Sequence, residues 1–438
     1  MIRVTFIRYT SLFFENNNGI PERKLVMKKI SVRARDMQAS PIRKLIPLAV
    51  AARKKGTIVY PLNIGQPDIP TPKPIREAIR NFDQEVLAYS PSQGEDFLVE
   101  AFAGYYKQNN IDLASEDIIV TTGGSEAIFF AFLSICDAGD EVLVFEPFYT
   151  NYNGIAFETG VQLRALTTYA EDGFQLPPAA AIEKAITERT RAILICNPNN
   201  PTGTVYSKKT LEELAAVAKK HNVYIISDEV YREFTYDGLQ HTSILQIPGM
   251  AQHAILIDSI SKRYSACGAR IGLVASKNRE VMAACLKFAQ ARLSSPTIEQ
   301  WGARAGILMD PSYFQPILEE YQRRRDAVMA GLAKIPGVVC KTPTGAFYVI
   351  AKLPIKNSDK FAAWLLTDFV HQGSSVLVAP AAGFYVNPGL GLDEIRISYV
   401  LEVAKLEKAM DVLAEAVKQY RQLENAGNHK EKSASANV

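Results

Sequence analysis

The sequence lacks a strong charge of either sign. Lys and Arg number 49 and Asp and Glu number 46, so the formal net charge is only +3 in 438 residues. This balance gives no electrostatic reason to expect binding to nucleic acid or to a membrane surface. Hydrophobic residues make up 47% of the chain, which indicates a globular protein with sizeable cores and excludes a wholly disordered one.

Cysteine and histidine are also scarce, with five residues of each. The cysteines form no C-x-x-C pair and the histidines show no metal-ligand spacing, so we expect neither a metal site nor a disulfide framework. Scattered thiols favour a reducing compartment, the cytoplasm. The longest clean apolar run, Ala127 to Cys136, is far shorter than the ~20 residues that span a bilayer, and it predicts a buried helix.

The two ends of the chain differ from its middle. Residues 1–26 carry arginines and aromatics with no acid before Glu15, which faintly resembles a targeting peptide. Arg8 interrupts the apolar run, however, and no A-x-A-like cleavage site follows it. We therefore predict an N-terminal extension outside the fold over 1–26. Residues 426–438 are small and polar, which predicts a disordered tail.

Short apolar runs alternate with helical stretches in the first part of the chain. Six runs are nearly continuous in Val, Ile and Leu, as strands buried on both faces of a parallel sheet require: 118–121, 142–145, 192–196, 223–227, 254–257 and 271–275. Between two of them, Lys208–Lys220 places Leu211 and Leu214 on one helical face, and Ser207 can cap its start. This alternation predicts an α/β fold with a mostly parallel sheet flanked by helices.

The pattern changes after residue 300. A helix is expected from Pro311 to about Lys334, with the Arg323–Arg325 run on its solvated face. Short strands are expected near 338–340, 347–351, 376–379 and 395–399, followed by a last helix over Glu402–Gln422. We therefore predict a large domain over 62–300 and a smaller α+β domain over 301–425. An N-terminal arm over 27–61 is expected to pack with the smaller domain.

Polar strings follow the predicted strands, and in a parallel sheet the ligand lies at the carboxyl ends of the strands. These strings are Gly123-Gly124-Ser125, Tyr149 after Glu146-Pro147-Phe148, Asn197-Pro198-Asn199-Asn200-Pro201-Thr202-Gly203, Asp228-Glu229-Val230-Tyr231, and Ser259-Ile260-Ser261-Lys262 with Gly268-Ala269-Arg270. Each has a plain structural alternative, such as a tight turn, a helix cap or a surface lysine, and Phe148 is expected in the core.

Together these strings offer an anion cradle, an aromatic plate, an amide, an acid, a phenol, a lysine and an arginine along one edge. That set is complementary to pyridoxal phosphate, which carries a dianion, a flat ring, a phenolic oxygen, a ring nitrogen and an aldehyde. A lysine at this edge is a candidate Schiff-base nucleophile.

From about Ser40 to the last helix the sequence closely resembles the class I/II aminotransferases of pyridoxal-phosphate fold type I. The resemblance rests on the order and spacing of three strings: Asn-Pro-Thr-Gly at 200–203, Asp228-x-x-Tyr231, and Ser259-x-x-Lys262 followed by Gly268-x-Arg270. It implies a seven-stranded-type sheet in the large domain. It also implies a homodimer with shared active sites.

The resemblance also implies residue roles. Lys262 matches the lysine that forms the Schiff base, Asp228 the acid that pairs with the ring nitrogen, and Tyr231 with Asn200 the partners of the phenolic oxygen. The other expected site residues are the phosphate ligands Gly124, Ser125, Ser259 and Arg270, the ring-stacking Tyr149, the phosphate ligand Tyr89 lent by a second subunit, and the α-carboxylate ligands Arg396, Gly65 and Asn200. Lys262, Asp228 and Tyr231 are the expected catalytic residues.

The implied reaction moves an amino group from an L-amino acid to a 2-oxo acid such as 2-oxoglutarate in a ping-pong sequence. L-Aspartate is the favoured donor, because the Asn63–Asp68 and Ser259–Tyr264 strings look like bacterial chains assigned as aspartate aminotransferases. A dicarboxylate needs a second cation, for which Arg43, Arg263 and Arg292 are candidates. Ala269 and Tyr149 keep an aromatic or broad-range aminotransferase open as the alternative.

Two further hypotheses differ in class. A carbon–sulfur lyase of the same fold would release pyruvate and ammonia without an acceptor. A transcription regulator with an aminotransferase-like domain would need a DNA-binding domain, and the region before Ser40 is too short for one. We expect no nucleic acid, membrane or metal partner.

Overall fold

The computed structural model describes residues 28–38 and 40–435, so the extension expected over 1–26 lies outside the described residues. The chain divides into two compact units, with the boundary between Met37 and Gln38. The described part of the first unit contains helix α1 (Val32–Asp36), whose start is capped by the Ser31 hydroxyl. The other helices and strands of the described residues belong to the second unit.

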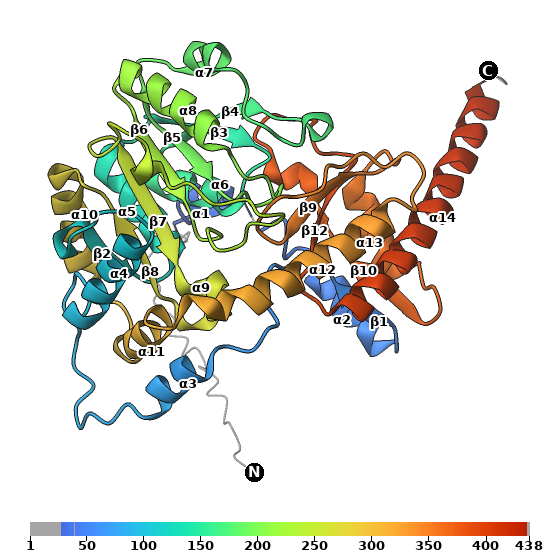
Figure 1. The fold of residues 1–438 in the computed structure, drawn as a ribbon. Helices are drawn as coiled ribbons and strands as arrows, with labels where there is room; N and C mark the ends of the chain where they lie inside the picture. The colour runs from blue at the N-terminus through green and yellow to red at the C-terminus, as the bar shows by residue number, and fades with distance from the viewer. Residues whose placement is uncertain (1–27, 39, 436–438) are drawn as a thin grey trace, which may run out of the picture. The chain divides into compact units, whose positions relative to one another are not determined.

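A seven-stranded sheet is the largest sheet of the second unit (Figure 1). Its spatial order is β2-β8-β7-β6-β5-β3-β4. The strands are β2 (Ile118–Thr121), β3 (Glu141–Glu146), β4 (Gln162–Thr167), β5 (Thr190–Cys196), β6 (Tyr224–Asp228), β7 (Ala254–Ser259) and β8 (Gly272–Ala275). The strands from β4 to β7 are parallel, and β8 runs antiparallel to both of its neighbours. The predicted α/β class with a mostly parallel sheet is confirmed.

Helices cover both faces of this sheet, as its continuous apolar strands require. Ile119, Val142 and Val144 point into one core layer, while their neighbours Leu143 and Phe145 point into the opposite layer. The helices of this part of the chain are α3 (Lys73–Arg80), α4 (Asp96–Gln108), α5 (Gly124–Ile135), α6 (Asn151–Thr159), α7 (Ala179–Ala185), α8 (Lys208–His221), α9 (Ile260–Arg263), α10 (Arg279–Arg292) and α11 (Thr297–Ile307).

Helix α8 shows how local sequence sets these elements. It begins where predicted, because the Ser207 hydroxyl accepts a hydrogen bond from the Thr210 N–H at 3.1 Å. Leu211 and Leu214 are buried on its inner face. The helix ends at Asn222, which takes a left-handed conformation with φ of 51° and stops the chain from continuing as a helix.

The C-terminal part forms a second group of elements. They are α12 (Phe314–Leu332), β9 (Tyr348–Lys352), α13 (Ser358–Thr367), β10 (Ser374–Leu377), β11 (Ala379–Pro380), β12 (Glu394–Ser398) and α14 (Val403–Ser435). Strands β11, β12 and β9 form an antiparallel sheet, and the long helices α12 and α14 pack against each other (Figure 1). Short 3₁₀ turns occur at Ser115–Asp117, Ala170–Asp172, Ile244–Gln246, Cys267–Ala269, Pro311–Tyr313 and Ala381–Phe384.

The segment before the large sheet packs with these C-terminal elements. Strand β1 (Ile58–Pro61) pairs in parallel with β10, and helix α2 (Ile46–Lys54) contacts α13. The described residues from Gln38 onward nevertheless form one compact unit. The division into a large domain and a small domain therefore stays a prediction.

Four local expectations differ from the structure. The expected strand at 338–340 is only a single bridge between Val339 and Lys352. Strand β4 was not predicted, because this edge strand alternates polar and apolar residues instead of forming an apolar run. The backbone is helical as far as Ser435, where a disordered tail from residue 426 was expected, and no proline interrupts it.

The fourth difference concerns the arginine run of α12. Arg324 and Arg325 are each only 4% exposed, so the expected solvated face is wrong for both. Arg324 pairs with Asp68 at 2.6 Å, and Arg325 pairs with Asp237 at 2.6 Å. Both carboxylates come from distant segments of the chain, and each offsets the desolvation cost of burying a guanidinium group.

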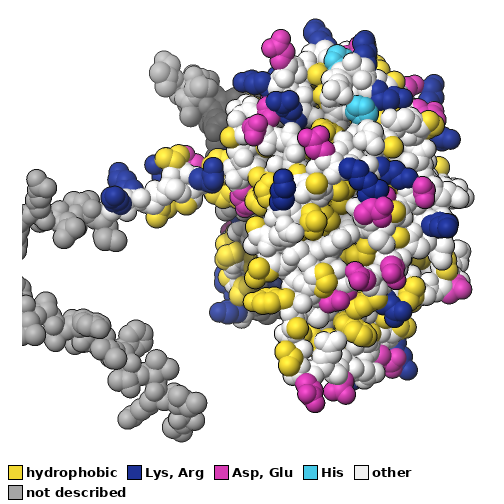
Figure 2. Space-filling view, turned by 90° about the vertical axis from the view of Figure 1, so that its left-hand side faces the viewer, with side chains coloured by type: hydrophobic (Ala, Val, Ile, Leu, Met, Phe, Trp, Pro, Cys, Tyr) yellow, Lys and Arg dark blue, Asp and Glu magenta, His cyan; other side chains and the backbone are white. Residues whose placement is uncertain are grey.

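The surface agrees with the balanced composition. Basic and acidic side chains are mixed over the face drawn in Figure 2. Among the described residues, no helix combines the length and apolar character needed to cross a membrane.

Candidate active site

A cavity of about 580 Å³ lies at the carboxyl ends of β5, β6 and β7, beside the start of α5. It gathers residues from positions 40 to 396, far apart in the chain. The predicted site residues that line it are Gly65, Gly124, Ser125, Tyr149, Asn200, Asp228, Tyr231, Ser259, Lys262, Arg270 and Arg396. Tyr89 is the one predicted site residue that does not line it in the described chain.

The turn between β2 and α5 allows an anion to approach the backbone closely. Gly123 has φ of +75°, and a Cβ added there would lie 2.3 Å from Nη2 of Arg270. This guanidinium is fixed over the turn by donating to the Thr122 carbonyl oxygen at 3.3 Å. No side chain among the described residues caps α5, so the N–H groups at its start, at Gly124 and Ser125, can bind an anion.

Ser259 ends β7 and holds the start of the short helix α9. Its hydroxyl accepts a hydrogen bond from the Ser261 N–H at 3.0 Å and lies 2.7 Å from the Ser261 hydroxyl. It is also 3.0 Å from the Ile271 carbonyl oxygen. The hydroxyl thus fixes the segment that carries Lys262 and borders the cavity from the same edge as Ser125.

Asp228 closes β6 and is only 4% exposed. Its carboxylate accepts hydrogen bonds from the Tyr152 hydroxyl at 2.7 Å and from the Val230 N–H at 3.4 Å. Burial raises the pKa of Asp228 to about 6, although both hydrogen bonds act in the opposite direction. No ion pair to it forms among the described residues, so a cation placed beside it would favour the charged form.

Two phenols and an amide also line the cavity. The hydroxyl groups of Tyr231 and Tyr348 lie 2.9 Å apart, and the Asn200 amide donates to Tyr231 at 3.4 Å. Burial raises the pKa of Tyr231 well above its usual value, which keeps this phenol protonated as a donor. Sequence reasoning missed Tyr348, because it lies in an apolar string that reads as a core strand.

Lys262 reaches into the cavity from α9. Its Nζ donates to the Gly65 carbonyl oxygen at 2.9 Å and lies 3.8 Å from Sγ of Cys267. A Cβ added to Gly65 would lie 1.8 Å from the Tyr348 hydroxyl oxygen. A residue without a side chain is therefore required at position 65, which keeps its backbone within reach of the lysine.

Arg396 is a buried cation with unused hydrogen-bonding capacity. It is 2% exposed and donates to the side chain of Asn200 at 3.0 Å and to the backbone carbonyl of Asn63. Its guanidinium lies over the rings of Tyr348 and Phe384, at 4.6 and 5.0 Å from their centroids. Its buried Nε has no hydrogen-bond partner in the described chain. Burial lowers the pKa of the Arg396 guanidinium. A carboxylate entering the cavity would supply the missing acceptor.

The neighbouring aromatic residues Phe148 and Tyr149 lie in different surroundings, and the prediction that Phe148 lies in the core is confirmed. Phe148 is buried in the core and stacks on Tyr152 with a centroid distance of 6.1 Å. Tyr149 lines the cavity, and burial raises its pKa to about 12. Tyr89 is 80% exposed on the segment before α4. Its expected role at a second subunit's site therefore stays a prediction.

The three candidate arginines for a second carboxylate differ in position. Arg263 is 1% exposed and pairs with Asp258, away from the cavity lining. Arg292 pairs with Glu126 at 3.4 Å and also lies outside the lining. Arg43 alone of the three lines the cavity.

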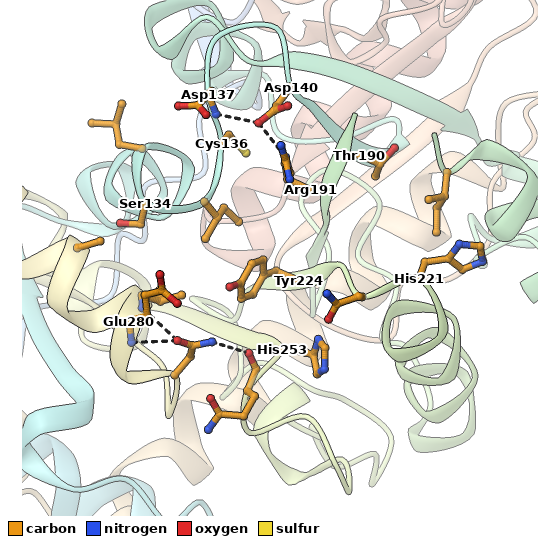
Figure 3. Close-up of a pocket in the computed structure, with 18 of the residues that line it drawn as sticks. Ser134, Cys136, Asp137, Asp140, Thr190, Arg191, His221, Tyr224, His253 and Glu280 are labelled. Carbon is orange, nitrogen blue, oxygen red and sulfur yellow. Dashed lines mark hydrogen bonds and ion pairs between the residues drawn. The ribbon is translucent and has the colours of Figure 1, made fainter. Parts of the chain in front are cut away.

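A second cavity lies at the opposite edge of the sheet, where β3, β5, β6 and β7 begin (Figure 3). Its volume is about 1280 Å³. The Asp140 carboxylate accepts a hydrogen bond from Nε of Arg191 at 2.9 Å, so these two opposite charges are paired (Figure 3). Burial raises the pKa of the nearby Cys136 thiol to about 12, which makes it a poor nucleophile. No cluster of three or more metal-ligating side chains occurs in the described chain.

The fold and the 580 Å³ cavity at the carboxyl ends of the strands together define an α/β enzyme with its active site at that edge of the sheet. The chain belongs to the aminotransferase class I and II family, whose model matches residues 57–413. It is therefore a transaminase, as the sequence predicts.

Individual relatives cover nearly the whole chain. The chain is 32% identical over 396 residues to the aspartate/prephenate aminotransferase of Thermus thermophilus, covering 89% of this chain and 98% of the relative. It is 33% identical over 390 residues to the aspartate aminotransferase of Thermotoga maritima, covering 87% and 97%. A putative aminotransferase of Bacillus subtilis is 35% identical over 391 residues, covering 87% and 96%.

Solved structures have the same fold. The aspartate aminotransferase of Thermus thermophilus with maleate superimposes with a TM-score of 0.81 at 31% identity, covering 89% of this chain and all of the other. The alanine aminotransferase of Pyrococcus furiosus also gives a TM-score of 0.81, at 32% identity and with the same coverage.

Proposed function

We propose that this transaminase uses pyridoxal phosphate, bound in the 580 Å³ cavity. The observation that carries the proposal is the placement of Asp228, Lys262 and Arg270 around one cavity at the strand ends. The residues present fit the cofactor. The uncapped start of α5 and Arg270 suit its phosphate, and the buried Asp228 carboxylate suits its ring nitrogen.

The remaining contacts follow from the chemistry of the donors. Tyr231 and Asn200 offer an O–H and an N–H to the phenolic oxygen, while Tyr149 offers an aromatic face to the ring. Ser125 and Ser259 add hydroxyl groups at the phosphate. When bound, the cofactor supplies an aldehyde that takes up the amino group and a ring that accepts the electron pair of the breaking Cα–H bond.

The protein's own groups then bind the substrate and move its proton. Arg396 presents a planar fork to the α-carboxylate, and its unpartnered Nε gains an acceptor there. Asn200, which already accepts a hydrogen bond from Arg396, borders the same carboxylate, as does the Gly65 backbone. The Lys262 amine carries the proton away from the substrate Cα. Because Nζ bonds the Gly65 carbonyl, it is held at the side where that carboxylate binds.

We propose L-aspartate as the favoured amino donor and a 2-oxo acid such as 2-oxoglutarate as the acceptor. Relatives named aspartate or aspartate/prephenate aminotransferase support this choice. The alternative is an aromatic or broad-range aminotransferase. An equally similar structure is an alanine aminotransferase, which favours keeping that alternative. A carbon–sulfur lyase has no specific support among these relatives.

The deciding experiment is an absorption spectrum of the purified protein with pyridoxal phosphate, before and after addition of L-aspartate without a 2-oxo acid. Conversion of the bound cofactor to its amine form is expected. An unchanged spectrum with aspartate but conversion with alanine or tyrosine would move the assignment to the alternative. Lys262→Ala serves as the control, because it should bind the cofactor without converting it.

We also propose a homodimer in which Tyr89 reaches the phosphate site of the partner. Tyr89 is exposed beside the exposed Val86 and Leu87, which a second copy would cover. Mixing Tyr89→Ala chains with Lys262→Ala chains tests this. Mixed dimers should regain activity, because one of their two sites combines an intact Lys262 with an intact Tyr89. A fully active monomer would refute the shared site.

We place the protein in the cytoplasm. All five cysteines are free thiols, and Cys196 and Cys285 are buried. Fractionation of the source cells with an antibody to the chain tests the location.

A further inference from the structure

Two buried charges lie directly beside proposed site residues in the chain. Asp258 precedes Ser259, and Arg263 follows Lys262. Both charged side chains are only 1% exposed, and neither lines the cavity, whereas Ser259 and Lys262 do. The proposed function gives this pair no role. Because a buried ion pair adds little stability over an apolar pair of similar volume, stability alone does not account for it.

The ion pair closes the turn that carries Lys262. Asp258 lies in β7, and Arg263 is the last residue of helix α9, so one contact between side chains joins the strand to the end of the helix. The helix has only four residues, too few to be stable from its backbone hydrogen bonds alone. The ion pair therefore fixes the direction in which α9 leaves the strand.

The Asp258 carboxylate is itself held by two other groups. Its Oδ2 accepts a hydrogen bond from the Tyr106 hydroxyl of α4 at 2.6 Å, and its Oδ1 accepts one from the Ser259 N–H at 2.6 Å. Burial raises the pKa of Tyr106 well above its usual value, so this phenol stays protonated and remains a donor. Both the strand and α4 thus fix the acceptor that Arg263 uses.

The Arg263 guanidinium depends on Asp258 for its orientation. Asp258 accepts the one hydrogen bond that this guanidinium donates within the described chain, where its buried Nε and Nη1 have no partner. The guanidinium also lies over the Tyr105 ring, 4.6 Å from the centroid. Asp258 and Tyr105 therefore define its position, and through the backbone they also hold Lys262.

Lys262 is consequently held on both sides along the chain. Before it, the Ser259 hydroxyl accepts a hydrogen bond from the Ser261 N–H at 3.0 Å. After it, the Arg263 side chain is anchored by its ion pair. Because a lysine side chain is long and flexible, a fixed backbone limits the positions that its amine can reach. In the structure, that amine donates to the Gly65 carbonyl oxygen at 2.9 Å.

We propose that Arg263 is a positioning residue, which directs Lys262 into the cavity through its ion pair with Asp258. This inference rests on the Schiff-base role proposed for Lys262 and adds to it a residue outside the cavity. Without the ion pair, the end of α9 can shift, and the amine meets an aldehyde in the cavity less often in the productive geometry. A displacement of about 1 Å is enough to slow a reaction ~100-fold.

The test separates bonding to Lys262 from binding in the cavity. Pyridoxal phosphate can bond to the lysine, whereas pyridoxamine phosphate carries an amine in place of the aldehyde and can only bind. The affinity of the cofactor-free, full-length protein for pyridoxamine phosphate therefore reports the rest of the site. The rate at which pyridoxal phosphate becomes attached to Lys262 reports the position of the amine. Borohydride reduction at timed intervals, followed by peptide mass spectrometry, measures that rate.

Arg263→Met and Asp258→Asn each break the ion pair, and the double variant leaves neither charge buried alone. Arg263→Lys keeps the positive charge. Arg325→Met is the matched control, because Arg325 is also buried, pairs with Asp237 at 2.6 Å and lies over the Tyr236 ring, 5.1 Å from its centroid. Arg325 lies on α12 and does not line the cavity.

Each single variant should slow the attachment by roughly 10- to 100-fold and leave the affinity for pyridoxamine phosphate unchanged. The double variant should be no slower than the slower single variant, because both residues act through one contact. It decides alone if the single variants fail to fold. Arg263→Lys should fall between Arg263→Met and the wild type. Arg325→Met should match the wild type in both measurements, although it lowers the unfolding temperature.

Two results would overturn the inference in distinguishable ways. If the double variant attaches the cofactor at the wild-type rate, or if attachment and pyridoxamine phosphate binding weaken together, Arg263 is only structural and the role of Lys262 survives. If mass spectrometry of the wild type finds the cofactor on another residue or on none, the role proposed for Lys262 fails, and that of Arg263 fails with it.

Discussion

Asp228 should make the cofactor-free protein less stable than it would be with an amide at the same position. The carboxyl group is 4% exposed, and burial raises its pKa from 3.8 to about 6. Asp228→Asn keeps an oxygen that can accept the hydrogen bond from the Tyr152 hydroxyl, but it removes the charge. The substitution removes the buried charge together with the acceptor of the longer, 3.4 Å hydrogen bond from the Val230 N–H, so the lost charge dominates its effect.

The shift predicts both the size and the pH window of the effect. About 2.2 pKa units at 1.36 kcal/mol per unit correspond to about 3 kcal/mol. Because the folded protein holds the proton more tightly than the unfolded chain, its stability falls as the pH rises from about 4 to about 6. Asp228→Asn should therefore match the wild type near pH 4 and exceed its unfolding free energy by up to about 3 kcal/mol at pH 7 and above.

Urea denaturation of both cofactor-free proteins, at equal concentration and at several pH values, measures this difference. Asp140→Asn is the control of opposite sign. The pKa of Asp140 is lowered by its hydrogen bonds to the Asp137 backbone and Arg191, against the effect of burial, so that variant should lose stability at neutral pH. The reasoning is refuted if the gain of Asp228→Asn is absent or does not change with pH.

Three further outcomes are expected. Lys262→Ala should abolish amino transfer in a steady-state assay without added amine, and a substantial residual rate would contradict its role. Arg324→Met should lower the unfolding free energy by about 2–4 kcal/mol in urea titration, because it removes the buried cation that pairs with Asp68. A loss below about 0.5 kcal/mol would mean that this ion pair contributes little to stability. Gly203→Ala should lower the unfolding free energy by more than about 2 kcal/mol, because its Cβ would lie 2.3 Å from a proline side chain at φ of +73°. Gly56→Ala, with φ of +92° and open space, should cost only about 1 kcal/mol, and equal losses would refute the clash.

The sheet and the cavity residues were predictable for the same reason. A parallel sheet brings the carboxyl ends of its strands to one edge. The polar strings at the ends of the neighbouring strands β5, β6 and β7 were therefore expected to lie close together. Strand runs that are apolar on both faces are recognisable in a sequence. The edge strand β4 is not recognisable in this way, because polar and apolar residues alternate along it and it is only partly buried.

Side-chain partners were harder to predict, because they depend on distant segments. Arg324 and Arg325 are buried by carboxylates 256 and 88 residues away, which no local pattern on the helix reveals. The same holds for Arg43, whose position at the cavity follows from a hydrogen bond between Asn63 and the Ile42 backbone. Tyr348 was missed because its apolar sequence neighbours indicate a core strand, whereas its hydroxyl group makes it part of the site.

The reversed direction of β8 has a consequence for how this site tolerates change in chain length. Because β8 runs against β7, the chain between Ser259 and Gly272 turns back at the same edge instead of crossing a face of the sheet. That one short loop holds both Lys262 and Arg270. An insertion within it would displace the amine and the guanidinium relative to each other, whereas an insertion at the far edge, between β8 and α10, would leave both in place. Loop length is therefore expected to be far more constrained at one end of β8 than at the other.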